Sequence, residues 1–297
     1  MKKATYIFGF VLLFSITPSA LHAQSFYLSF GAGYGIGING SRVNSYSTTY
    51  TYKIDTSYSH NTYSSNRVSL GNGFIPSLNL GIMFNKNIGF DISTAYLFGQ
   101  PYEYSQSDNY DFPYGYNSSI ALVQSLSGKS LLFIPSIIIK SNLESSLNYY
   151  LKAGFALGSS RIDEVSKITI MDGTSGKNNP YTHIDYTKEF GSSFSYGMQV
   201  SAGIELYFLE NLNLYAECGY LGYSTTPKSS ETVSYTYEGK DKLSELTTKQ
   251  KETIYVESYT EDDPIADNEP DKKLYTTYSF NMLHIEIGAR WSFGNKE

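Results

Sequence analysis

The chain of 297 residues is rich in Tyr (29), Phe (17) and Gly (25), and its 28 acidic and 22 basic residues give a net charge of −6. The acidic balance without a basic cluster argues against nucleic acid binding, and the single cysteine, Cys218, excludes an internal disulfide. Beyond the N-terminal segment the longest apolar run is 131–139, far short of the roughly 20 residues that a membrane-spanning helix needs.

The N-terminal segment is typical of a secretory signal peptide. Two lysines precede an apolar stretch at 7–14, and small residues lead to Ala23. We expect cleavage after Ala23, with Ala20 as a second candidate position, so that 1–23 is the signal peptide and 24–297 is one mature domain. The loss of two lysines leaves 20 basic and 28 acidic residues, a mature charge of −8.

Alternating apolar and polar residues predict strands with one apolar face, because successive side chains of a strand point to opposite sides. The clearest alternation is the last one, which ends in Trp291 and Phe293. Its length of about 11 residues suffices to cross a bilayer at barrel tilt, and its aromatic end suits an interfacial girdle. In chain order the predicted strands are 26–34, 74–84, 88–98, 130–140, 147–157, 194–208, 212–223 and 283–293.

The connections alternate between long and short. Bacterial outer-membrane barrels have an even number of strands, short periplasmic turns and long outer loops, and eight strands with both ends on one side produce this order. Within the long connections we expect a hairpin beyond the barrel rim in 158–193, partial ribbon in 224–277 and a mobile stretch at 261–273. The long loops are 35–72, 99–129, 158–193 and 224–277, and the turns are 85–87, 141–146 and 209–211.

We therefore predict an all-β fold, a closed antiparallel up-and-down transmembrane barrel of eight strands that occupies 24–297. Without an apolar helix, only a closed barrel satisfies the backbone polar groups in lipid. The expected location is the outer membrane of a Gram-negative bacterium, with the termini periplasmic and the long loops extracellular.

Two blocks of sequence resemble a known family. Residues 197–220 (GMQVSAGIELYFLENLNLYAECGY) look like the sixth strand, turn and seventh strand of the bacterial outer-membrane β-barrel domain family, which is OmpA-like and porin-like, and 148–158 is similar to its fifth strand. The resemblance implies an outer-membrane barrel and implies that Phe293, as a terminal outward aromatic residue, is read by the barrel-assembly machinery. Only four residues follow Phe293, so the peptidoglycan-binding domain of full-length OmpA is not expected.

Polar residues on the inward faces predict a network in the lumen. A barrel of eight strands is about wide enough for side chains to fill, and charges there must pair because an unpaired buried charge is strongly destabilising. We expect Arg290 to pair with Asp91 and Glu205, and Lys152 to pair with Glu217 or Glu286. The predicted network comprises Asp91, Lys152, Gln199, Glu205, Glu217, Glu286 and Arg290, with His284 also inward.

These patterns favour a structural or surface-recognition protein that acts through its extracellular loops. A small porin is the alternative, and a lipid-modifying barrel enzyme is less favoured because His60 and His183 lie in loops without an evident Ser or acid partner. We predict no catalytic residue and no cofactor. His183 and Asp185 together provide too few ligands for a metal site. The expected partners are membrane lipid and lipopolysaccharide, the barrel-assembly machinery, and an extracellular protein or glycan that the tyrosine-rich loops could bind. The protein is expected to be a monomer.

Overall fold

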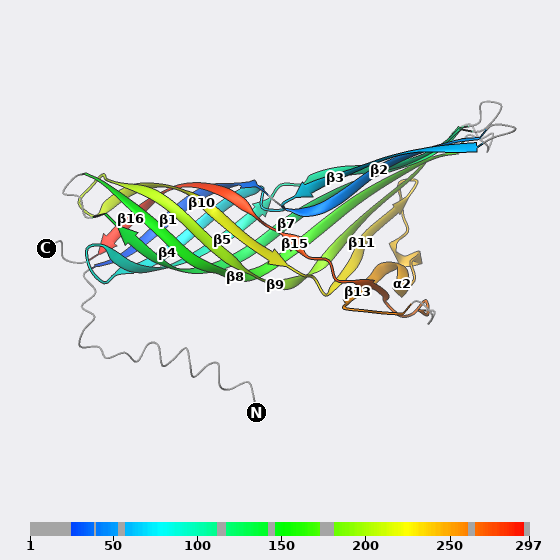
Figure 1. The fold of residues 1–297 in the computed structure, drawn as a ribbon. Coiled ribbons are helices and arrows are strands. Elements are labelled where there is room, and N and C mark those ends of the chain that lie inside the picture. The colour runs from blue at the N-terminus through cyan, green and yellow to red at the C-terminus, as the bar shows by residue number, and fades with distance from the viewer. Residues whose placement is uncertain are drawn as a thin grey trace.

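The computed structural model describes residues 25–38, 40–52, 57–111, 117–141, 146–172, 181–260 and 265–293. The predicted signal peptide lies outside these residues. In the described part, no helix is both long enough and apolar enough to cross a membrane. Nearly all of the regular structure is β-strand, as Figure 1 shows, which confirms the predicted all-β class.

Eight strands pair in a closed ring and form the barrel at one end of the molecule (Figure 1). Each strand is antiparallel to both of its neighbours, and the last strand of the ring pairs with the first. A closed ring has no edge strand whose backbone groups lack partners. In ring order the strands are β1 (Ser25–Gly37), β4 (Gly73–Met83), β5 (Ile88–Gly99), β7 (Asn117–Lys140), β8 (Leu147–Asp172), β9 (Tyr181–Tyr207), β10 (Leu212–Thr225) and β16 (Met282–Phe293).

The barrel continues on one side into a long, narrow sheet, which we name the extension (Figure 1). The far parts of β7, β8 and β9 form its centre, and shorter strands pair at both flanks. On one flank are β6 (Tyr102–Asp111), β2 (Ser41–Tyr52) and β3 (Ser57–Val68). On the other are β11 (Ser229–Tyr237), β12 (Lys240–Asp241), η2 (Leu243–Glu245), α2 (Thr248–Lys251), β13 (Glu252–Val256) and β14 (Asp271–Leu274), and β15 (Tyr278–Ser279) pairs with β10.

The prediction of eight strands in all is wrong, since the described residues form sixteen strands in one sheet. Except for β15, the additional strands lie in the predicted long loops, and β7 begins at Asn117 instead of Ser130. Three of them, β2, β3 and β6, consist almost wholly of polar residues and tyrosine, so they lack the apolar alternation that marks a half-buried strand. Backbone pairing with neighbouring strands joins them to the sheet.

Other expectations for the long connections are confirmed. The hairpin predicted within 158–193 is formed by β8 and β9, and the ribbon predicted in 224–277 is formed by β11 and β13. Within 261–273, which was expected to be mobile, Asp271 begins β14, a strand that pairs in parallel with β13. Residues 261–264 lie outside the described part.

Two of the three predicted tight turns at the opposite end of the barrel are present in the described residues. In the turn 85–87, the side-chain Oδ1 of Asn85 accepts hydrogen bonds from the backbone N–H of Asn87 at 2.8 Å and of Ile88 at 2.7 Å. Asn side chains favour such turns because they mimic a backbone acceptor. In the turn 209–211, the N–H of Leu209 donates to the carbonyl of Leu212 at 2.9 Å. Residues 142–145 of the third turn lie outside the described part.

The register of the barrel strands agrees with the sequence pattern. Apolar side chains such as Ile287, which is 65% exposed, point outward, whereas Asp91 and Arg290 point inward and are buried. In the part of β7 that is apolar on both faces, Ser136 points inward and Ile137 points outward. The barrel wall therefore has an apolar outer surface and an inner surface that contains the predicted polar residues.

Candidate functional site

The outer wall of the barrel carries an apolar belt that reaches around the whole ring. Every strand of the ring contributes at least one large apolar side chain that is exposed. The members, one for each strand in ring order, include Phe30, Leu80, Ile88, Ile137, Leu151, Val200, Leu214 and Ile287. Trp291 and Phe293 are exposed at the end of β16 that faces the tight turns.

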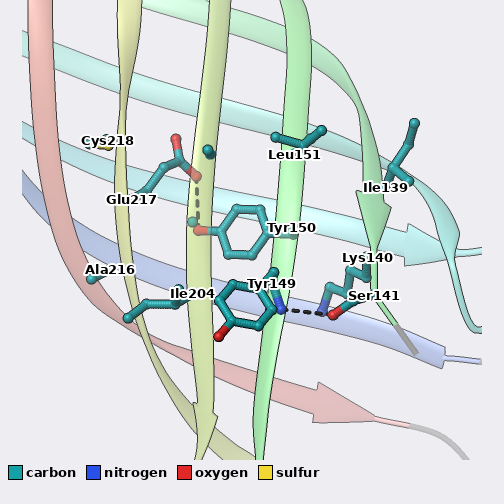
Figure 2. Close-up of a pocket in the computed structure, with 12 residues that line it drawn as sticks. Ile139, Lys140, Ser141, Tyr149, Tyr150, Leu151, Ile204, Ala216, Glu217 and Cys218 are labelled. Atoms are coloured by element: carbon teal, nitrogen blue, oxygen red, sulfur yellow. Dashed lines mark hydrogen bonds between the residues drawn. The ribbon is translucent and has the colours of Figure 1, made fainter. Parts of the chain in front are cut away.

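A groove hollows this belt over β7 to β10 (Figure 2). Its volume is about 740 Å³. The large outward side chains Tyr149, Leu151 and Ile204 flank it, and the small side chains of Ala202 and Ala216 leave space between them. Its exposed lining is almost wholly apolar, so the groove fits hydrocarbon better than a polar solute.

Arg290 is the centre of a polar layer in the half of the lumen near the tight turns. Its side chain is only 2% exposed, and Nη1 lies 2.5 Å from Oε2 of Glu205. Nε donates to Oγ of Ser29 at 3.0 Å. Sequence analysis missed the aromatic surroundings of the guanidinium, whose carbon Cζ lies 4.4, 5.2 and 5.3 Å from the ring centroids of Tyr27, Tyr150 and Tyr215. The available signal was the inward position of these tyrosines among Ser and Gly.

The carboxylate of Glu205 accepts hydrogen bonds from two cationic side chains. Besides Arg290, Nζ of Lys140 lies 2.7 Å from the same oxygen, Oε2. The other oxygen, Oε1, accepts from Nδ2 of Asn213 at 2.7 Å. Lys140 is not a member of the predicted network. Its contact balances part of the acidic excess that the sequence suggests for the lumen.

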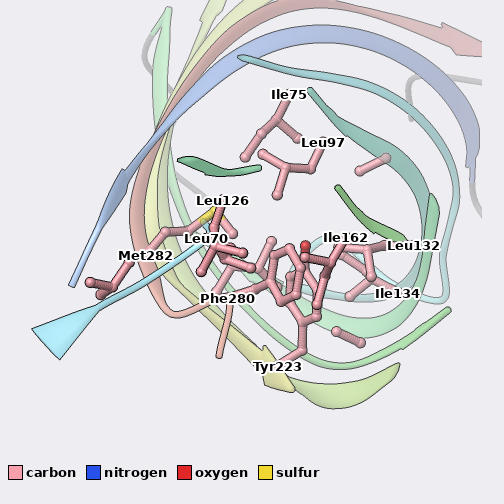
Figure 3. Close-up of a cluster of buried hydrophobic side chains, with 14 of the residues drawn as sticks. Leu70, Ile75, Leu97, Leu126, Leu132, Ile134, Ile162, Tyr223, Phe280 and Met282 are labelled. Carbon is pink, nitrogen blue, oxygen red and sulfur yellow. The ribbon is translucent and has the colours of Figure 1, made fainter. Parts of the chain in front are cut away.

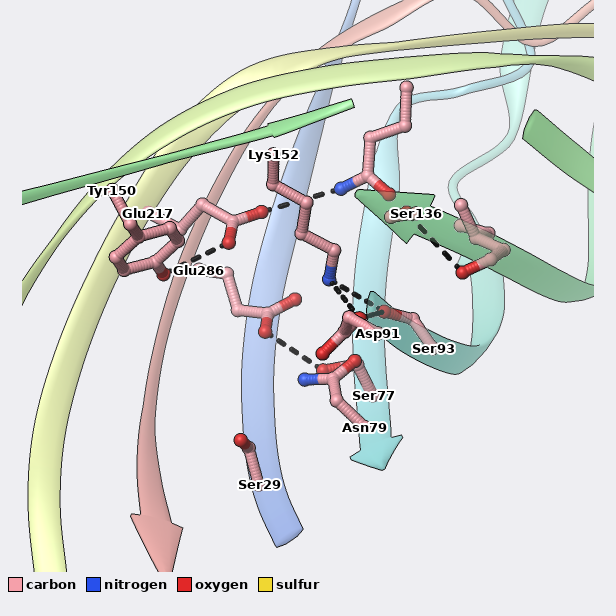
Figure 4. Close-up of polar contacts among 12 residues, drawn as sticks. Ser29, Ser77, Asn79, Asp91, Ser93, Ser136, Tyr150, Lys152, Glu217 and Glu286 are labelled. Carbon is pink, nitrogen blue, oxygen red and sulfur yellow. Dashed lines mark hydrogen bonds and ion pairs between the residues drawn. The ribbon is translucent and has the colours of Figure 1, made fainter. Parts of the chain in front are cut away.

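Asp91 pairs with Lys152, which differs from the predicted pairing. Nζ of Lys152 lies 2.8 Å from Oδ1 of Asp91 (Figure 4). Tyr27 donates a hydrogen bond from its hydroxyl to Oδ2 of Asp91 at 2.8 Å. The predicted pairing of Arg290 with Asp91 is wrong, because the Tyr27 side chain lies between them, bonded to the carboxylate and stacked on the guanidinium. The predicted pairing of Lys152 with Glu217 or Glu286 is also wrong, because the ammonium group of Lys152 pairs with Asp91 instead.

Glu217 and Glu286 lie opposite each other on β10 and β16 and are held mainly by neutral donors. Tyr150 donates from its hydroxyl to Oε2 of Glu217 at 2.9 Å (Figures 2 and 4), and Tyr215 donates to Oε1 of Glu286 at 2.6 Å. Around these pairs, Nε2 of Gln199 and Nε2 of His284 each lie 3.3 Å from Oε1 of Glu217, and Ser77 donates to Glu286 at 2.9 Å. All seven residues of the predicted network are thus buried in the lumen, in several local clusters.

The half of the lumen near the extension contains an apolar plug that sequence analysis did not predict (Figure 3). The ring of Phe280 is fully buried and stacks on that of Tyr223, with the centroids 4.9 Å apart and the planes 9° apart. The carbonyl of Asn281 accepts from the N–H of Ile38 at 2.8 Å and from Oγ of Ser69 at 2.6 Å, which anchors this segment across the barrel mouth. The plug comprises Leu70, Ile75, Leu97, Leu126, Leu132, Ile134, Ile162, Tyr223, Phe280 and Met282.

Of the two histidines considered for catalysis, the structure describes the side chain of His183. Nδ1 of His183 lies 3.4 Å from Oγ1 of Thr169, and the backbone N–H of His183 donates to Glu238. The side chain of His60 lies outside what the structure describes. Among the described residues, no group of three or more His, Cys, Asp or Glu is arranged to hold a metal ion.

Comparison with known proteins adds little to this description. No family model matches the chain, and no curated protein matches it. Among solved structures, the chain is similar to CarO2 of Acinetobacter baumannii, with 12% sequence identity, 91% of this chain and 100% of that chain covered, and a TM-score of 0.29. The class of the protein therefore follows from its own strand pairing: an all-β protein with a closed antiparallel ring and a sheet extension.

Proposed function

We propose that the protein is an outer-membrane β-barrel with a closed lumen, whose extension provides a structural or recognition surface outside the cell. The apolar belt is the observation that carries this proposal. Soluble monomers rarely expose contiguous apolar patches beyond a few hundred Å², whereas the belt includes all eight strands of the ring. A closed ring with an apolar exterior is the strand-based solution for a chain in lipid, because every backbone group finds a partner.

The shape of the molecule supports one orientation in the membrane. Outer-membrane barrels have short turns on the periplasmic side and longer structures outside. The extension would then be extracellular and the turns at 85–87 and 209–211 periplasmic. The resemblance noted in the sequence and the predicted signal peptide support export. We propose that the belt contacts membrane lipid and lipopolysaccharide. We also propose that the barrel-assembly machinery recognises Phe293, whose side chain is exposed at the end of β16.

The filled lumen favours the recognition role over the porin alternative. A solute would have to pass both the apolar plug around Phe280 and the ion-paired layer around Arg290, whose side chains are 0% and 2% exposed. In a planar bilayer, the purified full chain should show no discrete conductance steps at voltages that open ordinary porins. Sustained single-channel steps would support the porin function and exclude the closed-lumen proposal.

A charge in the apolar belt should destabilise the protein in lipid. Ile287→Arg should reduce the free energy of unfolding by about 2–4 kcal/mol, the range found for Arg near the midplane of such barrels. The matched control is Leu274→Arg in the extension, since Leu274 is 55% exposed and Ile287 is 65% exposed. Urea unfolding in lipid vesicles measures both variants. Equal, small effects in the two variants would show that the belt does not contact lipid.

Surface labelling tests the proposed orientation. In a Cys218→Ser background, a cysteine introduced at Lys240 in the extension should react with a membrane-impermeant maleimide on intact cells. A cysteine introduced at Lys86 in a tight turn should react only after the outer membrane is opened. Both lysines are exposed in the structure, so their intrinsic accessibility is matched. Labelling of Lys86→Cys but not Lys240→Cys on intact cells would reverse the orientation.

A further inference from the structure

A small pocket lies at the mouth of the barrel, between the apolar plug and the extension; we name it the mouth pocket. Its volume is about 220 Å³. The buried side chains of Val68, Leu70 and Leu126 are apolar groups of its lining, and Figure 3 shows the last two within the plug. Tyr104 of β6 and Tyr278 of β15 contribute two aromatic rings. The pocket thus has an apolar base and aromatic sides, with several hydroxyl groups at its edge.

Glu164 of β8 is the one charged residue among those that line the mouth pocket. Its Oε1 accepts from Nε2 of Gln124 at 3.1 Å and from Oγ of Ser166 at 3.2 Å. None of the ion pairs found in the described residues includes Glu164. A partly buried carboxylate that accepts hydrogen bonds only from neutral donors would be stabilised by a cation that enters the pocket.

The two tyrosines of the pocket suit a cationic ligand. Burial raises the pKa of Tyr104 to about 12, and the charge of Glu164 contributes in the same direction. Burial also raises the pKa of Tyr278. Both phenols are therefore neutral at physiological pH, and their rings present the negative π-face that attracts an ammonium or guanidinium group. Tyr278 is held in place by an edge contact with Phe190, with the centroids 5.5 Å apart.

We propose that the mouth pocket binds the end of one basic side chain, arginine or lysine, presented by an extracellular protein partner. Its volume of about 220 Å³ suits a single side chain. The methylene stem would lie on the apolar base and the charged head between the rings, at Glu164, as basic side chains prefer. The described residues of the segment 224–277 include 7 basic and 9 acidic ones, a net charge of −2, which also favours a basic partner. This inference rests on the proposed recognition role of the extension.

Lys188 of β9 provides an internal competitor for Glu164. The two residues are directly opposite in the pairing of β8 with β9, but they form no ion pair within 4.0 Å. Burial, with the nearby charge of Lys273, lowers the pKa of Lys188, and Glu164 and Asp271 act in the opposite direction. Removal of the Lys188 charge should therefore strengthen the attraction of Glu164 for an external cation. Loss of the Glu164 charge should have the opposite effect.

The test uses the full mature chain in detergent micelles, with Nα-acetyl-arginine amide as the probe and its citrulline analogue as an uncharged control of the same shape. Isothermal titration should show arginine binding at least about tenfold tighter than citrulline, since hydrogen bonds to charged groups are the stronger class. Glu164→Gln should remove that preference, and Lys188→Ala should increase the arginine affinity. Glu245→Gln, an exposed carboxylate in the extension that pairs with Lys242, should leave it unchanged. The folded band of each variant on an unheated gel checks that it has folded.

Several outcomes would overturn the inference. Equal binding of arginine and citrulline, or an unchanged arginine affinity in Glu164→Gln, would show that the carboxylate does not select the ligand. Tighter binding of a neutral hexose than of arginine would make the pocket a glycan site. Surface labelling separates this failure from that of the proposed function: an extension that is labelled on intact cells but does not bind arginine contradicts this inference alone.

Discussion

Replacement of Arg290 by Met should lower the free energy of unfolding by about 3–5 kcal/mol, the range observed when one partner of a buried ion pair is removed. The variant leaves Glu205 in the closed lumen with one cation, Lys140, instead of two. It also removes the guanidinium that stacks on Tyr27 and two other tyrosine rings. Met has a similar length and no charge, so the loss should reflect the missing interactions rather than a large cavity.

The temperature at which the folded band shifts on an unheated gel, together with urea unfolding in lipid vesicles, measures this loss. The matched control is Arg161→Met in the extension, where Arg161 pairs with Asp163 at 3.2 Å and with Glu189 while about half exposed. Exposed pairs contribute about 0–1 kcal/mol, so the control should unfold nearly like the unmodified chain. An Arg290→Met variant that unfolds at the same temperature as this control, and that conducts ions, would mean that the lumen contains water.

A double-mutant cycle separates the two ion-pair clusters of the polar layer. The effects of Glu205→Gln and Arg290→Met on the free energy of unfolding should be strongly non-additive, because each substitution removes the same 2.5 Å contact. The effects of Asp91→Asn and Arg290→Met should be closer to additive, since Asp91 pairs with Lys152 and is linked to Arg290 only through the side chain of Tyr27. The reverse pattern of coupling energies would contradict the arrangement of the clusters.

Phe280→Ala should produce a second large loss, of about 3–5 kcal/mol, because truncation of a buried phenylalanine removes apolar contacts and leaves a cavity. Phe280 is fully buried at the centre of the apolar plug and stacks on Tyr223. The control, Phe155→Ala, removes the same atoms from the outer face of β8, where Phe155 is 70% exposed. Urea unfolding in vesicles should show a loss several times larger for Phe280→Ala than for Phe155→Ala.

The same pair of variants tests whether the apolar plug is a packed core. Comparable losses in the two variants would mean that the plug contributes no more than side chains on the barrel exterior. Such a result would also weaken the closed-lumen proposal, because the plug separates the mouth pocket from the polar layer. The conductance of Phe280→Ala in a planar bilayer should stay at baseline, since the Arg290 layer still fills the other half of the lumen.

Local patterns in the sequence were sufficient to predict the barrel wall. Strict alternation, as in 283–293, determines which side chains face outward and which face inward, because a strand has a period of two. The inward positions of Asp91, Lys152 and Arg290 follow from that period alone, and all three are buried. The order of long and short connections likewise indicated the antiparallel ring.

Only the tertiary structure decided which inward residues meet. Arg290 pairs with Glu205 instead of Asp91 because the Tyr27 ring, from a strand far away in the sequence, occupies the space between them. The apolar plug depends on segments that contact each other only after the ring has closed, such as Phe280 with Leu70 and Tyr223. Strands such as β2 and β6 form through backbone pairing with distant partners, and their mostly polar sequences give no periodic signal for that pairing. Side-chain direction is a local property of a strand, whereas the partner across a lumen depends on closure, on relative height along the barrel and on which side chain fills the intervening space.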